Sequence, residues 1–281
     1  MAHITNDGVK VAYETHGIHG GTPIVLLMGL GLPGMIWHAL VDDLVERDFF
    51  VVIPDNRGTG HSDAPLPPYL MSEMSDDVAM ILDAEGIDEA MVVGVSFGGM
   101  LTQHVALNHP ERVSGLLLAA TTCGVPTGVF PRLESIWLLL KMVFASTTVT
   151  FEEAQKLFSH PESEERVRDL FSRWEDILDE LPTPPWAVLG QLLAAAFHHT
   201  GNSLDQIRVP TRVVTGDSDF LIPPKNSEIL AELIPNATLA MVPRAGHVFI
   251  HEHPESLLNN IIALREEVEL KRSGQHHQAA Q

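Results

Sequence analysis

Gly94-Val95-Ser96-Phe97-Gly98 lies between the apolar run at residues 90–93 and a helix-like segment at residues 100–106. A Gly-x-Ser-x-Gly that joins a strand to a helix is typical of a nucleophile elbow, a turn so sharp that only small residues fit beside the serine. Such a turn exposes the serine oxygen at the end of a sheet, next to a helix N-terminus that favours negative charge. The stretch therefore predicts a strand, a tight turn and a helix, with Ser96 as the nucleophile.

The segments on both sides of this stretch alternate between strand and helix patterns. Asn6-Asp7-Gly8 predicts a hairpin, which makes the start of the chain antiparallel. We expect strands at residues 23–28, 49–54, 91–95, 113–120, 211–215 and 238–242, and core helices near residues 35–47, 75–86 and 254–270. Continuous apolar strands separated by helices indicate an α/β fold with a mostly parallel sheet, covered on both faces.

This alternation stops between residues 124 and 205. The region carries helical patterns at residues 133–144, 151–158, 164–181 and 186–198, without a convincing strand. We therefore predict a helical cap at residues 124–205, inserted into a core made of residues 1–123 and 206–270. The polar residues 271–281 are predicted to be a disordered tail.

Composition excludes several classes of protein. The formal net charge is −20, which opposes binding to nucleic acid and to anionic membrane surfaces. Cys123 is the single cysteine, so an internal disulfide is excluded and a reducing compartment is favoured. The N-terminus lacks the pattern of a signal peptide, and the longest apolar run, residues 136–145, is too short to span a bilayer. We expect a soluble cytoplasmic chain; monomer and homodimer stay open.

Beyond the elbow, the chain resembles the α/β-hydrolase superfamily with a helical cap, over residues 3–270. The family order is nucleophile, acid and histidine, with the last two on loops after late strands. Here Ser96 is followed by Gly216-Asp217-Ser218-Asp219-Phe220-Leu221-Ile222-Pro223 and then by Ala245-Gly246-His247. Asp219 matches the Gly-x-x-Asp-x-x-x-Pro pattern of the family, and Asp217 is its rival. The resemblance implies an eight-stranded sheet.

Each of these residues has a chemical reason to be present. A serine hydroxyl is a weak nucleophile until a base takes its proton, and His247 is the candidate base. The carboxylate of Asp219 would hold the imidazole in the correct tautomer. The oxyanion would be held by the backbone amides of Phe97 and Leu30, although relatives often carry His-Gly where this chain has Met28-Gly29.

Two other features suggest sites and carry less weight. Residues 55–62 match the family pattern Asp-x-Arg-Gly-x-Gly-x-Ser, in which we expect a structural turn with Arg57 paired to backbone or carboxylate. Fifteen histidines invite a metal interpretation, but the pairs at 198–199, 251 with 253, and 276–277 lack carboxylate or cysteine partners at ligand spacing. We expect neither a metal nor a cofactor.

The resemblance implies a serine hydrolase that cleaves carboxylic esters of small apolar or aromatic substrates through an acyl-enzyme. A serine nucleophile argues against haloalkane dehalogenases and epoxide hydrolases, which use aspartate, and against dienelactone hydrolases, which use cysteine. The chain looks most like enol-lactone hydrolases and aclacinomycin methylesterase. Three alternatives remain: a cofactor-free haloperoxidase or perhydrolase, a carbon–carbon bond hydrolase, and a non-catalytic receptor. Apolar cap residues such as Trp137 and Trp186 suit an uncharged ester, although packing of the cap onto itself explains each of them better.

Overall fold

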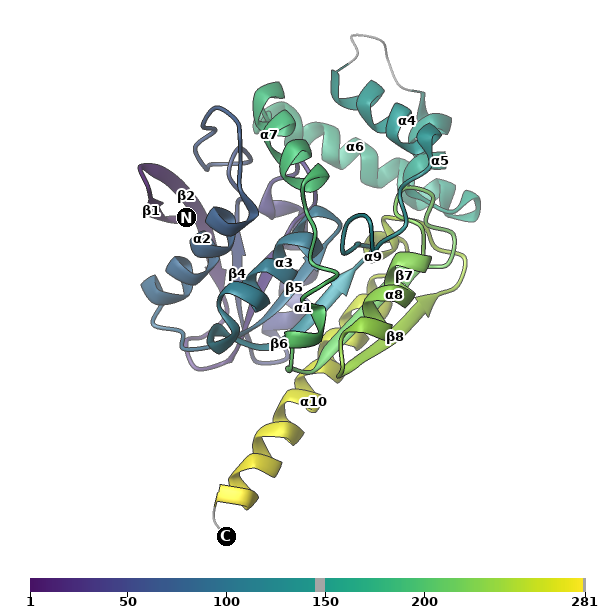
Figure 1. Cartoon of the computed structure of the whole chain (residues 1–281). Coiled ribbons are helices and arrows are strands. Elements are labelled where there is room, and N and C mark those ends of the chain that lie inside the picture. The colour runs from purple at the N-terminus through teal and green to yellow at the C-terminus, as the bar shows by residue number, and fades with distance from the viewer. Residues whose placement is uncertain (145–149, 280–281) are drawn as a thin grey trace.

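The computed structural model describes residues 1–144 and 150–279, which fold around one eight-stranded sheet (Figure 1). The strand order is β1-β2-β4-β3-β5-β6-β7-β8. Among the strands of the described residues, β2 runs opposite to the other seven, so its pairings with β1 and β4 are antiparallel. The strands are β1 (Ala2–Asn6), β2 (Val9–His16), β3 (Thr22–Leu27), β4 (Phe49–Pro54), β5 (Ala90–Val95), β6 (Val113–Ala119), β7 (Thr211–Gly216) and β8 (Ala237–Val242).

The strand predictions are confirmed closely. The six apolar runs predicted as strands are β3 to β8, and no end differs from its prediction by more than one residue. Asp7 and Gly8 have φ angles of 50° and 82°, the left-handed pair that a two-residue hairpin turn between β1 and β2 requires. The α/β class follows from these short-range patterns because the central strands β3, β4, β5 and β6 are buried along most of their length.

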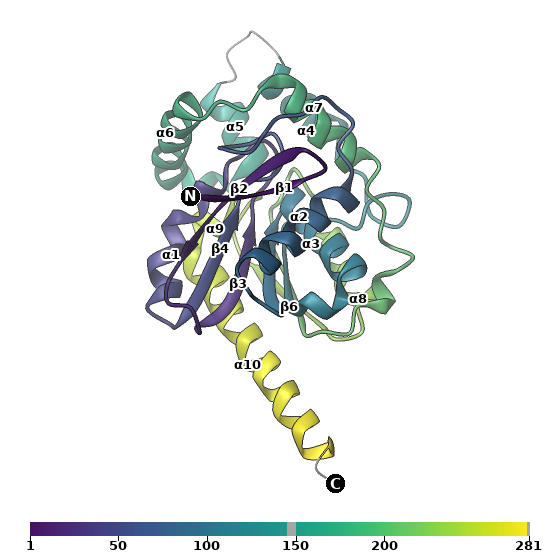
Figure 2. The same cartoon turned by 90° about the vertical axis from the view of Figure 1, so that its left-hand side faces the viewer.

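Helices cover both faces of the sheet (Figures 1 and 2). One face packs against α2 (Met71–Ala84), α3 (Phe97–Asn108) and α8 (Lys225–Leu233), and the other against α1 (His38–Val45), α9 (Phe249–Glu252) and α10 (Pro254–Ala279). Alternate residues of a strand serve the two cores: in β3, Val25 belongs to the first and Ile24 to the second.

Three helical predictions differ from the structure. The helix predicted from residue 75 begins at Met71, because the buried apolar stripe already includes Met71 and Met74. The helix predicted at residues 35–47 is a 3-10 turn (Gly34–Trp37) followed by α1, and the amide of Gly34 donates to Asp55 Oδ1 at 2.7 Å. The last helix continues to Ala279 and does not stop near residue 270. The short helices α8 and α9 were not predicted.

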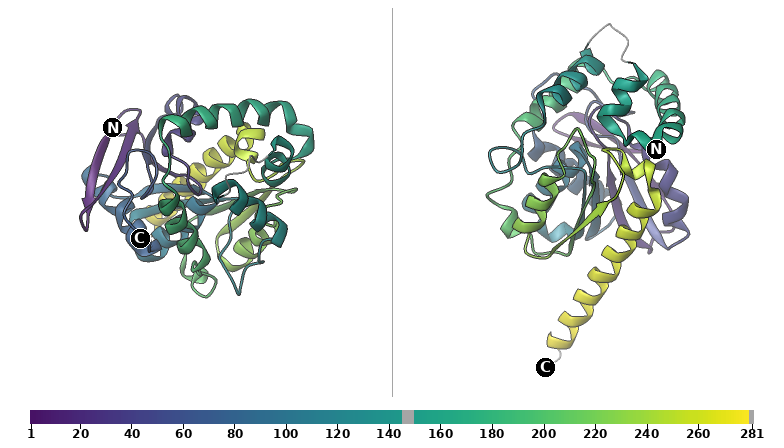
Figure 3. Two further views of the ribbon diagram at one scale, coloured as in Figure 1. Left: turned by 90° about the horizontal axis from the view of Figure 1, so that it is seen from above. Right: turned by 90° about the vertical axis from the view of Figure 1, so that its right-hand side faces the viewer.

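Four helices between β6 and β7 lie together over one end of the sheet (Figures 1 and 3). They are α4 (Leu133–Phe144), α5 (Phe151–Phe158), α6 (Glu164–Glu180) and α7 (Pro185–Ala196), and we call them the cap helices. The two ends of this segment meet at the core, since the amide of Thr200 donates to the carbonyl of Cys123 at 3.0 Å.

The buried His198 and the partly buried His104 reinforce that junction. His198 Nε2 lies 3.0 Å from the carbonyl of Thr122, and His198 Nδ1 lies 3.1 Å from His104 Nε2 on α3. Because a carbonyl only accepts hydrogen bonds, His198 must donate from Nε2, and its Nδ1 is then free to accept from His104. Burial lowers the pKa of His198 to about 3 and that of His104 to about 4, so both rings are neutral near pH 7.

This pair should make the fold sensitive to acid. The pKa of His198 is lower in the folded chain than its ordinary value of 6.5, so the unfolded chain takes up a proton as the pH falls below 6.5 and the folded chain does not. Stability is therefore present above pH 6.5 and is lost progressively towards pH 3. His198→Gln keeps a donor for Thr122 and an acceptor for His104 without titrating. We expect the loss of unfolding free energy between pH 7 and pH 5 to shrink by about 2 kcal/mol in this variant.

Urea unfolding followed by circular dichroism at both pH values measures this difference. His3→Gln, at an exposed position, is the matched control and should leave the loss unchanged. An equal loss in His198→Gln and wild type would contradict the assignment.

Candidate active site

Ser96 occupies a strained turn between β5 and α3. Its φ and ψ are 54° and −115°, a conformation that costs a residue with a side chain about 1–3 kcal/mol. The neighbouring glycines make the turn sterically feasible. A Cβ on Gly94 would lie 2.2 Å from the carbonyl oxygen of Gly98, and a Cβ on Gly98 would lie 2.1 Å from that of Leu27. The predicted strand–turn–helix is present, and α3 begins directly against the end of β3.

The chain around Ser96 is anchored on its other side by β6. The amide of Ser96 donates to the carbonyl of Ala119 at 2.9 Å, and Thr121 Oγ1 donates to the carbonyl of Ser96 at 2.8 Å. Both backbone groups of the serine are thus held, and its side chain alone is free to react.

Asp219 and His247 form a buried pair after β7 and β8. His247 Nδ1 lies 2.8 Å from Asp219 Oδ2, and the two residues are about one-twentieth exposed. The other carboxylate oxygen of Asp219 accepts from the amides of Leu221 and Ile222 at 2.9 and 2.8 Å. Hydrogen bonds from three groups keep this carboxylate fixed in place. Because His247 Nδ1 is paired with Asp219, Nε2 is the nitrogen of His247 that is available to a substrate.

The rival carboxylate has a different environment. Asp217 is exposed, and its Oδ1 accepts from Ser218 Oγ at 2.8 Å and from the amide of Arg244 at 3.0 Å. These hydrogen bonds help to lower the pKa of the Asp217 carboxyl group. They are typical of a turn residue, and here they join the loop after β7 to the loop after β8. Asp219, and not Asp217, is the residue that contacts His247.

Ser96 and the buried pair emerge at the same edge of the sheet. β5 is separated from β7 only by β6, β8 follows, and these strands are parallel. Among the described residues no hydrogen bond joins Ser96 to His247, whereas Asp219 and His247 are joined. Contacts between a nucleophile and its base are often long without substrate and tighten when it binds.

The loop after β3 lies beside the serine and is held from three directions. A Cβ on Gly29 would lie 3.7 Å from Ser96 Cβ. Asn56 Nδ2 donates to the carbonyl of Met28 at 3.1 Å, and Gln191 Oε1 and Thr183 Oγ1 bind the amide and carbonyl of Gly31 at 2.7 and 2.8 Å. These contacts come from the core and from the cap segment.

Two amides near the serine have no protein partner. Among the described residues, neither the amide of Leu30 nor that of Phe97 donates a hydrogen bond to another protein group. Unpaired donors beside a nucleophile are the geometry that stabilises negative charge on a substrate oxygen.

The segment predicted to be a structural turn has that role. Arg57 is buried and makes a two-pronged contact with Asp77, from Nε at 2.6 Å and Nη2 at 2.9 Å, with Glu73 at 3.1 Å from Nη1. Gln191 Nε2 donates to the carbonyl of Arg57 at 3.0 Å. One cap glutamine therefore joins this turn to the loop that carries Leu30.

Sequence reasoning missed a buried acid close to His247. Glu252 is 1% exposed, and its Oε2 accepts from the amide of Gly246 at 2.7 Å. Its Oε1 accepts from the amide of His160, in the cap segment, at 2.8 Å. Nearby, the amide of Val248 donates to the carbonyl of Phe158 at 2.8 Å. Nothing in the sequence indicated that Glu252 lies in the interior, because an acid without a visible partner is rarely buried.

A family model of the alpha/beta hydrolase fold matches residues 22–147 and 161–254, more than half of the chain. The chain belongs to the α/β-hydrolase family. Its relatives are named hydrolases. One, "Putative carbamate hydrolase RutD" of Caulobacter sp. (strain K31), is 30% identical over 86% of this chain and 91% of its own length. Another, the pimeloyl-[acyl-carrier protein] methyl ester esterase of Aeromonas hydrophila, is 28% identical over 90% and 98%.

A solved structure agrees with the α/β-hydrolase fold. The enol-lactonase of Burkholderia xenovorans LB400 superposes with a TM-score of 0.82 over 94% of this chain and all of its own, at 22% identity. That likeness shows the fold and leaves the substrate to other arguments. Within the described part of the chain, no helix has the length and apolarity to cross a membrane.

The assignment of Asp219 as the partner of His247 can be tested by replacing Asp219 and Asp217 with asparagine, one at a time. Asp219→Asn keeps the side-chain volume but removes the charge that orients His247, so kcat should fall by about 10⁴. Asp217→Asn, the matched control, should change kcat less than threefold. Steady-state hydrolysis of a p-nitrophenyl ester measures both. Equal losses, or a larger loss in Asp217→Asn, would reverse the assignment.

Glu252 can be tested as a positioning residue. Glu252→Gln places an amide NH₂ against one of two backbone donors, which should displace the His247 loop and lower kcat about 10- to 100-fold with KM nearly unchanged. Glu255→Gln, three residues further on and exposed, is the matched control. The kcat and KM values should be read well below each thermal midpoint. A variant whose kcat equals that of the control would show that Glu252 only stabilises the fold.

Proposed function

We propose that this protein is a serine hydrolase that cleaves carboxylic esters of small, uncharged apolar or aromatic substrates. The observation that carries the proposal is the buried Asp219–His247 hydrogen bond, at the edge of the sheet where Ser96 emerges. The esterase and hydrolase names of relatives that span nearly the whole chain support the same reaction class.

The proposed reaction begins at Ser96. Its Oγ attacks the ester carbonyl carbon while His247 Nε2 takes the hydroxyl proton, and the C=O electron pair moves onto oxygen. The amides of Leu30 and Phe97 donate to this oxyanion. When the tetrahedral intermediate collapses, the C–O bond to the alcohol breaks, and His247 gives its proton to the leaving alcohol. An acyl group remains on Ser96.

Water completes the cycle by the same route. The oxygen of a water molecule attacks the acyl carbon while His247 takes a proton from that water. The oxyanion again lies against the amides of Leu30 and Phe97. Collapse releases the carboxylic acid and returns the proton to Ser96. Asp219 stays ionised throughout and stabilises the imidazolium formed in each half-reaction. These residues complete the cycle without a cofactor.

The preference for uncharged substrates follows from the cap helices and from the overall charge. Several cap residues expose large apolar surface: Trp137, Leu140, Met142, Trp186, Leu189 and Leu193. Other apolar cap residues pack inward, since Leu138 is buried and Trp174 packs against the core. A chain of net charge −20 repels anionic substrates.

Carbamate hydrolysis is a second candidate, because a 30% identical relative carries that activity in its name. It uses the same nucleophile, base and oxyanion donors, with an amine or alcohol as the leaving group. The single free cysteine, Cys123, suits a reducing compartment, and we propose a cytoplasmic location.

A matched set of substrates tests the proposal. We expect kcat/KM for a neutral aromatic acetate to exceed that for the carbamate of the same phenol, and that for a carboxylate-bearing ester of equal size, by about tenfold or more. Ser96→Ala should abolish all three activities. Peracid-dependent halogenation and cleavage of a carbon–carbon bond are assayed beside the three ester and carbamate substrates, because a haloperoxidase and a carbon–carbon bond hydrolase are the alternative enzymes. A higher kcat/KM for the carbamate would favour the second candidate.

A phosphonate probe separates an enzyme from a receptor. Wild type should be labelled once per chain, and Ser96→Ala should not be labelled, in intact-mass spectra. An unlabelled wild type that still binds the ester would favour the receptor.

A further inference from the structure

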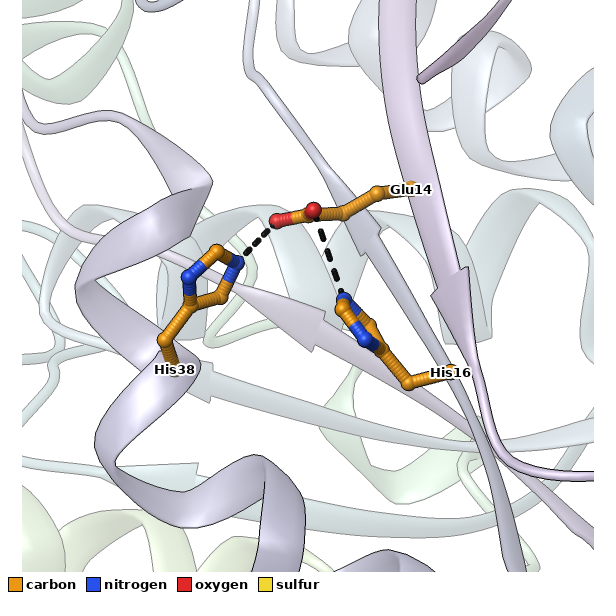
Figure 4. A group of neighbouring side chains, drawn as sticks. All are labelled: Glu14, His16 and His38. Atoms are coloured by element: carbon orange, nitrogen blue, oxygen red, sulfur yellow. Dashed lines mark hydrogen bonds and ion pairs between the residues drawn. The ribbon is translucent and has the colours of Figure 1, made fainter.

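Glu14, His16 and His38 form a cluster outside the proposed catalytic site (Figure 4). Glu14 and His16 are two residues apart on β2, so their side chains leave the same face of the strand. His38 is the first residue of α1, which packs on that side of the sheet beside β4. Figure 4 shows the carboxylate of Glu14 between the two imidazole rings.

All three residues turn a potential ligand atom towards the same point. His38 Nε2 contacts Glu14 Oε1, and His16 Nε2 lies 3.4 Å from Glu14 Oε2. The ligand atoms all lie within 4.8 Å of one another. Atoms bound tetrahedrally at about 2.0 Å from one zinc ion are about 3.3 Å apart. The separation of 3.4 Å between His16 Nε2 and Glu14 Oε2 matches this spacing.

One of these atoms lacks a hydrogen-bond partner. His16 Nε2 is buried from solvent, and its approach to Glu14 does not have the geometry of a hydrogen bond. A buried polar atom without a partner destabilises the folded chain. A cation between the three side chains would bind this nitrogen.

We propose that Glu14, His16 and His38 bind one Zn²⁺ ion per chain. Imidazole nitrogens favour zinc-like ions over Mg²⁺ and Ca²⁺, which prefer oxygen ligands. The side chains of Glu14, His16 and His38 are 19%, 30% and 43% exposed, which leaves a path for the ion and a fourth position for water.

The ion would join β2 to the start of α1. These two elements are 22 residues apart at their ligands, and hydrogen bonds between β2 and β4 hold only the strand. A bridge of this kind stabilises the folded chain and adds nothing to the proposed chemistry at Ser96. It also differs from the histidine pairs that the sequence singled out, none of which contributes a ligand.

The test uses the full chain without an affinity tag. Every protein in the test carries His276→Ala and His277→Ala, because two adjacent histidines can bind metal themselves. Isothermal titration with Zn²⁺ should give one site per chain with a micromolar or tighter dissociation constant, and titration with Mg²⁺ should give no heat. At a hundredfold excess of zinc over that constant, the thermal midpoint should rise by about 5 °C. Co²⁺ should give visible absorption bands typical of nitrogen and oxygen ligands.

His16→Ala and His38→Ala should each weaken zinc binding at least tenfold, and Glu14→Gln should do the same while keeping the side-chain shape. His109→Ala is the matched control: this surface histidine pairs with one carboxylate, Asp76, and should leave binding unchanged. Esterase activity should be the same in all four variants and confirms that they fold. Absence of a one-equivalent site, or equal affinity in the control and the cluster variants, would overturn the proposal.

Discussion

Close backbone contact at the nucleophile turn is the constraint on which the rest of the site depends. The carbonyl of Leu27 occupies the space where a side chain at Gly98 would lie, so α3 begins directly against the end of β3. That contact places the free amide of Phe97 beside the loop that carries Leu30. It also holds Ser96 in a conformation that is unfavourable for a residue with a side chain. The surrounding hydrogen bonds offset this strain.

The cap segment contributes to the site as well as covering it. Gln191 and Thr183 hold the loop after β3, and Glu252 joins the His247 loop to the chain just after α5. The loops proposed to hold the oxyanion and the base are thus fastened to the part of the chain that would select the substrate. The same hydrogen bonds would transmit a displacement of the cap segment to both loops.

Histidines of this chain differ in role according to their surroundings. His247 is paired with a buried carboxylate, His198 and His104 are neutral partners at the cap junction, and His16 and His38 flank Glu14. No local sequence pattern separates these cases, because each depends on which groups pack against the ring. Counting histidines or reading their spacing therefore predicted no metal site, whereas a strand and a helix bring three candidate ligands together.

The sequence by itself determined the strands and the turn at Ser96, since each rests on residues only a few positions apart. The order of serine, acid and histidine came from the resemblance to the α/β-hydrolase superfamily. The pattern around Asp219 also distinguished it from Asp217. Tertiary structure alone decided the partners of Gln191, Glu252 and Glu14. Gln191 binds the amide of Gly31 from 160 residues away, and His160 binds Glu252 across 92. Contacts over such distances follow from how the cap helices pack on the sheet, which no local pattern encodes.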